Sequence, residues 1–127
     1  MREIKINQNH EKLTLKFVSN SLHVFAFQTR LMDTDANTII EQFEASIGNK
    51  KDYKKTLNTP LKQLDDKYLR ILFTITAPII DSDYELQLMI FADDEQLSKD
   101  EPVFLAGKTT HGEATDFIHI HFTFSGS

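Results

Sequence analysis

The sequence predicts an α+β fold, in which an antiparallel sheet of about six to seven strands carries one main amphipathic helix. Apolar and polar residues alternate through most of the chain, as they do on strands that bury one face. One segment changes to helical spacing, and short polar stretches separate the alternating segments as turns do. The length favours a single domain over residues 1–127.

The first strands are predicted near the N-terminus. In KLTLKFV, the apolar residues Leu13, Leu15 and Phe17 fall on one side of a strand and polar residues fall on the other. The stretch SNS then predicts a turn before LHVFAFQTRL. We therefore expect these two segments to form a hairpin.

The helix is predicted in DTDANTIIEQFEASIG. Its apolar residues fall at helical spacing; they are Ile39, Ile40, Phe43 and Ile47. The segment from Asp33 to Asp35 supplies N-cap residues, and Gly48 is a C-terminal stop signal. The pattern predicts one amphipathic helix over residues 35–47.

Four further strands are expected in the second half of the chain. YLRILFTITAPI and YELQLMIFA both alternate, and DSD between them predicts a hairpin turn. VFLAGKTT and the final TDFIHIHFTF are expected to form a second hairpin around HGEA. The sheet would then close as a barrel or pack as a sandwich.

Several strands have a second face that is not fully polar. The large apolar residues on it are Leu72, Met89, Phe91, Phe104 and Phe117. Because one helix covers only part of a sheet, something else should bury this surface. We expect a homo-oligomer interface or a protein partner there, and the alternative is a cavity for a small apolar ligand.

The composition excludes several classes of protein. The net charge of -5 argues against a nucleic-acid partner. The chain has no cysteine, which excludes thiol chemistry and favours a cytoplasmic location. The N-terminus lacks a signal-peptide pattern and no apolar run approaches about 18 residues, so no membrane association is expected.

His119 and His121 form the candidate site for zinc or iron, since residues two apart share a face of a strand. Zinc or iron needs at least a third ligand, and His111 is expected too far along the strand to supply it. The pair resembles the His-x-His of cupin metal centres, but that family also needs a downstream glutamate and a further histidine, and only FTFSGS follows here. The ordinary interpretation is two semi-polar side chains on an outer face.

The segment DTDANTIIEQFE is similar to an EF-hand calcium loop in the spacing of its oxygen-bearing residues. The sixth position of that loop requires glycine, whereas this chain has Thr38. Helix capping therefore explains the aspartates better, and no cofactor is expected.

Complete enzyme signatures are missing from the sequence: it has no G-x-S-x-G, no Walker motif and no H-E-x-x-H. The interpretation that fits best is a non-enzymatic binding protein that acts through the semi-apolar sheet face, as a homo-oligomer. One alternative is a small hydrophobic ligand-binding protein with a Phe-lined cavity. Another is a metal-dependent enzyme that uses His119 and His121.

Overall fold

A computed structural model describes residues 1–48 and 51–125 of the chain. Within these residues the chain forms ten strands and one short 3-10 helix. The elements are β1 (Arg2–Ile6), β2 (Leu13–Ser19), β3 (Val24–Met32), β4 (Ile39–Ile47), β5 (Asp52–Thr56), η1 (Leu61–Gln63), β6 (Tyr68–Thr76), β7 (Asp83–Ala92), β8 (Glu95–Leu97), β9 (Val103–Lys108) and β10 (Glu113–Phe124).

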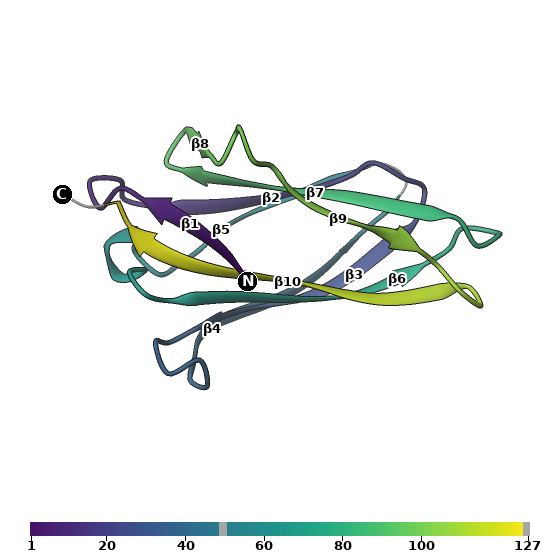
Figure 1. Cartoon of the computed structure of the whole chain (residues 1–127), viewed down its shortest axis with the longest axis horizontal. Coiled ribbons are helices and arrows are strands. Elements are labelled where there is room, and N and C mark those ends of the chain that lie inside the picture. The colour runs from purple at the N-terminus through teal and green to yellow at the C-terminus, as the bar shows by residue number, and fades with distance from the viewer. Residues whose placement is uncertain (49–50, 126–127) are drawn as a thin grey trace.

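The strands form two sheets that lie one above the other (Figure 1). Sheet A has the order β1-β10-β6-β3-β4, in which β1 pairs with β10 in parallel and the other pairs are antiparallel. Sheet B has the order β5-β2-β7-β8, and β9 also pairs with β7. The architecture is a β-sandwich, in which each sheet has one inward and one outward face.

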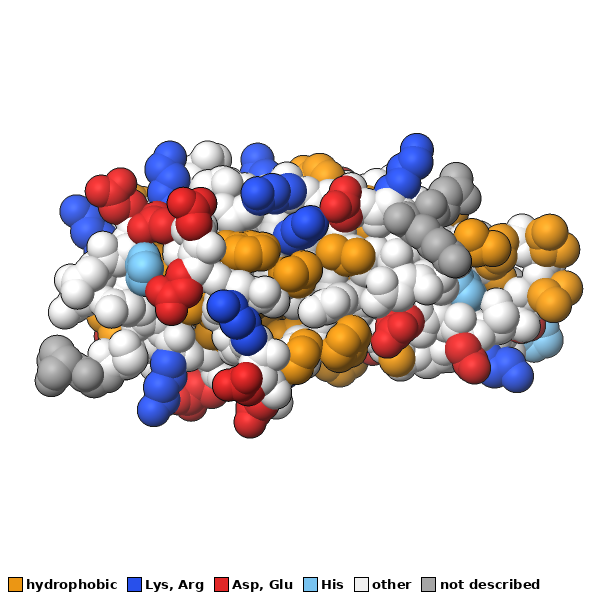
Figure 2. Space-filling model, turned by 90° about the horizontal axis from the view of Figure 1, so that it is seen from above, with side chains coloured by type: hydrophobic (Ala, Val, Ile, Leu, Met, Phe, Trp, Pro, Cys, Tyr) orange, Lys and Arg blue, Asp and Glu red, His pale blue; other side chains and the backbone are white. Residues whose placement is uncertain are grey.

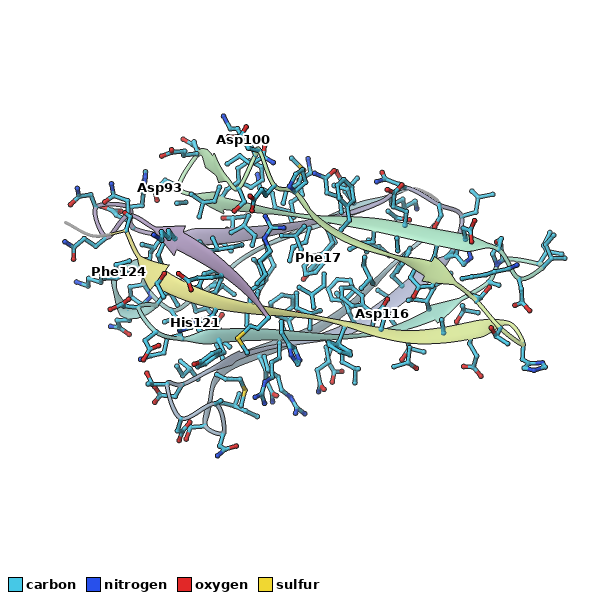
Figure 3. The ribbon with its side chains drawn as sticks, in the orientation of Figure 1. Phe17, Asp93, Asp100, Asp116, His121 and Phe124 are labelled. Atoms are coloured by element: carbon cyan, nitrogen blue, oxygen red, sulfur yellow. The ribbon has the colours of Figure 1, made fainter. Side chains whose placement is uncertain are left out.

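The inward faces of both sheets share one hydrophobic core, and aromatic rings fill its middle. Phe17 on β2 is fully buried between the two layers (Figure 3). Its ring stacks on Phe27 of β3 with 4.2 Å between centroids and meets Phe73 of β6 edge-on at 6.3 Å. These contacts join sheet B to sheet A, and the large rings occupy the space between the sheets.

The predicted helix over residues 35–47 is wrong, and with it the α+β fold class. This segment is β4, which pairs antiparallel with β3 along the edge of sheet A. The described chain is 62% strand and 2% helical, and it holds no helix of seven or more residues. None of the helical structure in these residues is long and apolar enough to cross a membrane.

The helix was predicted because apolar residues recur every four residues in this segment, a spacing that is compatible with a helix and also with a strand. Residues spaced by four, such as Ile39, Phe43 and Ile47, fall on one side of a helix and equally on one side of a regular strand, because four is a multiple of two. In β4, Ile47 is buried and Phe43 packs against the core, whereas Ile39 lies beyond the irregularity and is 43% exposed. Ile40 is the residue that breaks the alternation, and it lies at the irregularity in the register where Leu31 pairs with Glu41 and Met32 pairs with Ile39. A β-bulge therefore explains the extra apolar residue.

The three hairpins expected from the sequence are also wrong. Each pair of consecutive segments is divided between the sheets: β2 and β3, β6 and β7, and β9 and β10. Turn residues show that the chain reverses, but a connection that crosses from one sheet to the other reverses it as well. Among the described residues, consecutive strands pair as hairpins at β3–β4 and β7–β8.

Candidate functional site

The five apolar residues of the predicted second face do not form one surface. Leu72 and Phe117 lie on the outward face of sheet A, on β6 and β10. Met89, Phe91 and Phe104 lie on the outward face of sheet B, on β7 and β9. Because the outward faces of a sandwich point in opposite directions, the molecule has two separate semi-apolar faces.

On sheet A, Leu72 and Phe117 are direct cross-strand partners in the middle of the sheet. Their side chains are 50% and 59% exposed, so both project into the solvent. An open pocket of about 240 Å³ lies beside them. It is lined by Gln28, Arg30, Met32, Arg70, Ile71, Leu72, Phe117 and His119. We call the residues of this lining that are not buried the sheet A site; they are Gln28, Arg30, Arg70, Leu72, Phe117 and His119.

Two arginines stand side by side in the sheet A site. Arg30 on β3 and Arg70 on β6 are paired across the ladder, and opposed side chains of this kind have Cβ atoms about 5 Å apart. Neither guanidinium forms an ion pair or a side-chain hydrogen bond within residues 1–48 and 51–125. No local sequence pattern marks either arginine, since their meeting depends on the register of strands far apart in the chain.

His119 continues the same row, because it is the cross-strand partner of Arg70 on the other side. Partial burial, the charge of Arg70 and the charge of the Met1 amino group lower the pKa of His119 below its ordinary value. The shift favours the neutral imidazole, whose ring centroid lies 4.8 Å from that of Phe117. The positive charge of Arg70 also disfavours the binding of a metal cation by the imidazole of His119.

His121 shares the outward face with His119 but has different contacts. Its Nε2 lies 2.7 Å from Oδ1 of Asp66, and its ring stacks on Tyr68 with 4.5 Å between centroids. In the described ranges, no group of three or more histidine, cysteine, aspartate or glutamate residues is placed to hold a metal ion. The metal assignment of the histidine pair stays a prediction that lacks a third ligand in this part of the chain.

The aspartates of the calcium-like segment form the turn between β3 and β4. The carboxylate of Asp35 accepts hydrogen bonds from the backbone N–H groups of Asn37 and Thr38 and from the hydroxyl of Thr38. These bonds lower the pKa of Asp35. Asp33 contacts Lys67 at 3.2 Å. Asp33 and Asp35, which were predicted to cap a helix, therefore stabilise a turn between two strands.

The outward face of sheet B carries the second apolar surface, which we call the sheet B patch. Figure 2 shows hydrophobic side chains gathered along the middle of this face, with lysines and acidic residues around them. The patch consists of Val18, Met89, Phe91 and Phe104. At its margin Lys16 forms an ion pair with Asp52 at 3.6 Å. Both signs of charge therefore border this patch.

A larger open pocket of about 390 Å³ lies at the end of the sandwich, between the loops that follow β1 and β5. The residues that line it are of polar or charged type except for Pro60, and they include His10. The two ring nitrogens of His10 contact Asp93 at 3.2 Å and Glu95 at 3.0 Å, so both are already engaged. The residues that line this pocket include no large apolar side chain, whereas the sheet A site contains Leu72 and Phe117, which favours sheet A as the candidate site.

Comparison of the chain with protein-family models, with curated protein sequences and with solved structures finds no match in any of the three.

Proposed function

We propose that this protein is a non-enzymatic binding protein whose partner contacts the sheet A site. The observation that carries the proposal is the direct pairing of Leu72 with Phe117, both half exposed in the middle of a sheet and beside an open pocket. Exposed aromatic and aliphatic side chains that are clustered rather than scattered mark interaction surfaces. Aromatic residues and arginine are also the residues enriched at interface hot spots.

Site-specific photocrosslinking tests this proposal. Protein that carries p-benzoylphenylalanine at position 72 is irradiated in an extract of the source cells, and we expect one dominant adduct. Unlabelled wild-type protein should suppress the adduct by competition, whereas the Phe117→Ser variant should compete at least about tenfold less well, as loss of a buried aromatic contact predicts.

The matched control places the same photoreactive residue at position 79. Ile79 is 93% exposed in the connection between β6 and β7, so it is more accessible than Leu72 but lies outside the sheet A site. The proposal is wrong if both positions give the same adducts, or if Phe117→Ser competes as well as wild type.

We also propose that the protein self-associates through the sheet B patch. Charges of both signs border the patch, including Lys16, Asp52 and Glu85, so a second copy turned by a two-fold rotation can meet opposite charges around an apolar centre. The sheet A site is unsuited to this role, because a two-fold contact there would bring arginines together. A cytoplasmic location remains part of the proposal and is supported by the absence of cysteine.

Light scattering measures this association. Wild-type protein is expected to have the mass of a dimer at about 100 µM, in the range of weak interfaces. The double variant Phe91→Ser/Phe104→Ser should be a monomer, and the matched variant Leu72→Ser on the opposite face should remain a dimer. A strictly monomeric wild type would remove the basis for self-association.

A further inference from the structure

The arginines of the sheet A site are an unfavourable arrangement for the isolated fold. Like charges directly opposite each other on neighbouring strands destabilise a sheet. Arg30 and Arg70 are such a pair, and no acidic side chain of the described residues forms an ion pair with either. Glu44 is close on the same face, but its carboxylate accepts a hydrogen bond from Gln28 at 3.0 Å. The pair therefore has unused capacity to bind an anion.

Guanidinium groups are suited to one class of ligand in particular. Each presents a planar set of donors that matches a carboxylate or a phosphate with two parallel hydrogen bonds. Two neighbouring guanidinium groups can bind one such anion together, or each can bind a separate anion. His119 next to Arg70 adds a neutral ring nitrogen that can donate a further hydrogen bond.

The apolar side chains of the sheet A site indicate which kind of molecule carries the anion. Leu72 lies directly beside Arg70 along the alternating face of β6, and Phe117 is the partner of Leu72. The pocket of about 240 Å³ is smaller than the pockets that enclose drug-sized molecules, which begin at about 300 Å³. Its size fits one large side chain of a peptide. A ligand that fits the whole site thus has a carboxylate and an apolar side chain as neighbours.

We propose that the sheet A site binds an acidic peptide segment of a partner protein, with its carboxylates on Arg30 and Arg70 and an apolar side chain between Leu72 and Phe117. This inference rests on the proposed binding function and specifies the chemistry of the partner. The net charge of -5 makes an extended nucleic-acid strand a poor alternative, because the repulsion from the rest of the molecule grows with the length of the strand.

Fluorescence anisotropy tests the proposal with a fluorescein-labelled peptide that has one phenylalanine between two pairs of glutamates. Binding is expected at low ionic strength, and it should weaken severalfold between 50 and 300 mM salt, values chosen around the physiological ionic strength. The double variant Arg30→Gln/Arg70→Gln should weaken binding at least about tenfold, the effect of losing one charge-assisted hydrogen bond. The double variant Arg30→Lys/Arg70→Lys should retain only part of the wild-type peptide affinity, because lysine cannot form the two parallel hydrogen bonds.

Two matched peptides and one stability measurement serve as controls. Replacement of the glutamates by lysine should abolish binding, and replacement of the phenylalanine by alanine should weaken it. The melting temperature of Arg30→Gln should equal or exceed that of wild type, since the variant removes a repulsive pair. A lower melting temperature together with unchanged peptide affinity would assign the arginines a structural role and overturn the inference.

The remaining outcomes identify another source of the anion. If inorganic phosphate displaces the peptide at equal concentration, or single-stranded DNA binds more tightly than the peptide, the assignment to an acidic peptide is wrong. The photocrosslinking experiment at position 72 is independent of the arginines. Suppose that the adduct depends on Phe117 but that the peptide affinity is unchanged when Arg30 and Arg70 are replaced. This result would refute the inference about an acidic peptide and would still support the proposed binding function.

Discussion

Replacement of Phe17 by alanine is expected to lower the free energy of unfolding by about 3–5 kcal/mol. Phe17 is fully buried and stacks on Phe27 with 4.2 Å between ring centroids. The substitution removes this ring and leaves a cavity between the sheets that the rigid strands cannot close. Urea or guanidinium unfolding of both proteins measures the difference.

Phe104→Ala is the matched control, because Phe104 is 48% exposed on the outward face of sheet B. Its cost should stay below about 1 kcal/mol in dilute protein, as is usual for surface positions. If Phe17→Ala cost no more than Phe104→Ala, the ring of Phe17 would not lie between two packed sheets, and the sandwich would be wrong.

The same core positions the sheet A site. Phe27 and Phe73 point inward from β3 and β6, the strands whose outward residues include Arg30 and Arg70. A shift of one residue in the pairing would turn these aromatic rings out of the core and the arginines into it. The cost of burying the arginines thus helps to fix the register that brings them together.

Alternation predicted which residues of β2 lie in the core. Leu13, Leu15 and Phe17 are fully buried, as their period of two requires. The pattern could not predict the pairing of strands, because a hairpin and a connection between sheets both begin with a turn. The chain's apolar spacing at residues 39, 43 and 47 was also compatible with two periods, so local pattern alone could not decide between helix and strand.

The candidate site was predictable only in part. Phe117 and Leu72 were recognisable as large apolar residues on the otherwise polar side of their strands. The pairing of Arg30 with Arg70 had no local signal, since it requires β3 and β6 to be neighbours in one sheet. A usable signal was that each arginine occupies an outward position of a strand whose inward residues are apolar.

Alkaline pH is expected to destabilise the protein through Tyr84. Its hydroxyl donates a hydrogen bond of 2.8 Å to Asp116, and burial together with this carboxylate raises the pKa of Tyr84 to about 12. The raised pKa means that the folded protein favours the protonated phenol. This contribution to stability, roughly 2 kcal/mol, is complete below pH 10 and is lost as the pH rises from about 10 to about 12.

Tyr84→Phe should remove this part of the alkaline transition. At neutral pH the variant should cost about 1 kcal/mol, the usual loss of one hydrogen bond, while Asp116 still accepts a bond from the backbone N–H of Phe117. Unfolding measured from pH 7 to pH 11.5 compares the two proteins. An unchanged loss of stability above pH 10 in Tyr84→Phe would assign the alkaline transition to other groups.

Gly107 gives a second measurement of the same contact. A Cβ atom at this position would overlap the hydroxyl oxygen of Tyr84 and lie 2.7 Å from its Cζ, because Tyr84 and Gly107 are direct partners between β7 and β9. Gly107→Ala should therefore cost about 1–3 kcal/mol through overpacking. In the Tyr84→Phe background the cost should fall, with a coupling energy of at least about 0.5 kcal/mol, since the nearest atom is gone.

Gly112→Ala separates contact from backbone strain. Gly112 has φ +87° and nothing within 4 Å of its Cβ position, so alanine there is strained without touching any side chain. Its cost should be the same in wild type and in Tyr84→Phe. Coupling at Gly107 and none at Gly112 would place the ring of Tyr84 over β9, where glycine is required because an aromatic side chain of the neighbouring strand covers it. Equal coupling at both glycines would instead indicate a general effect of Tyr84→Phe on the fold.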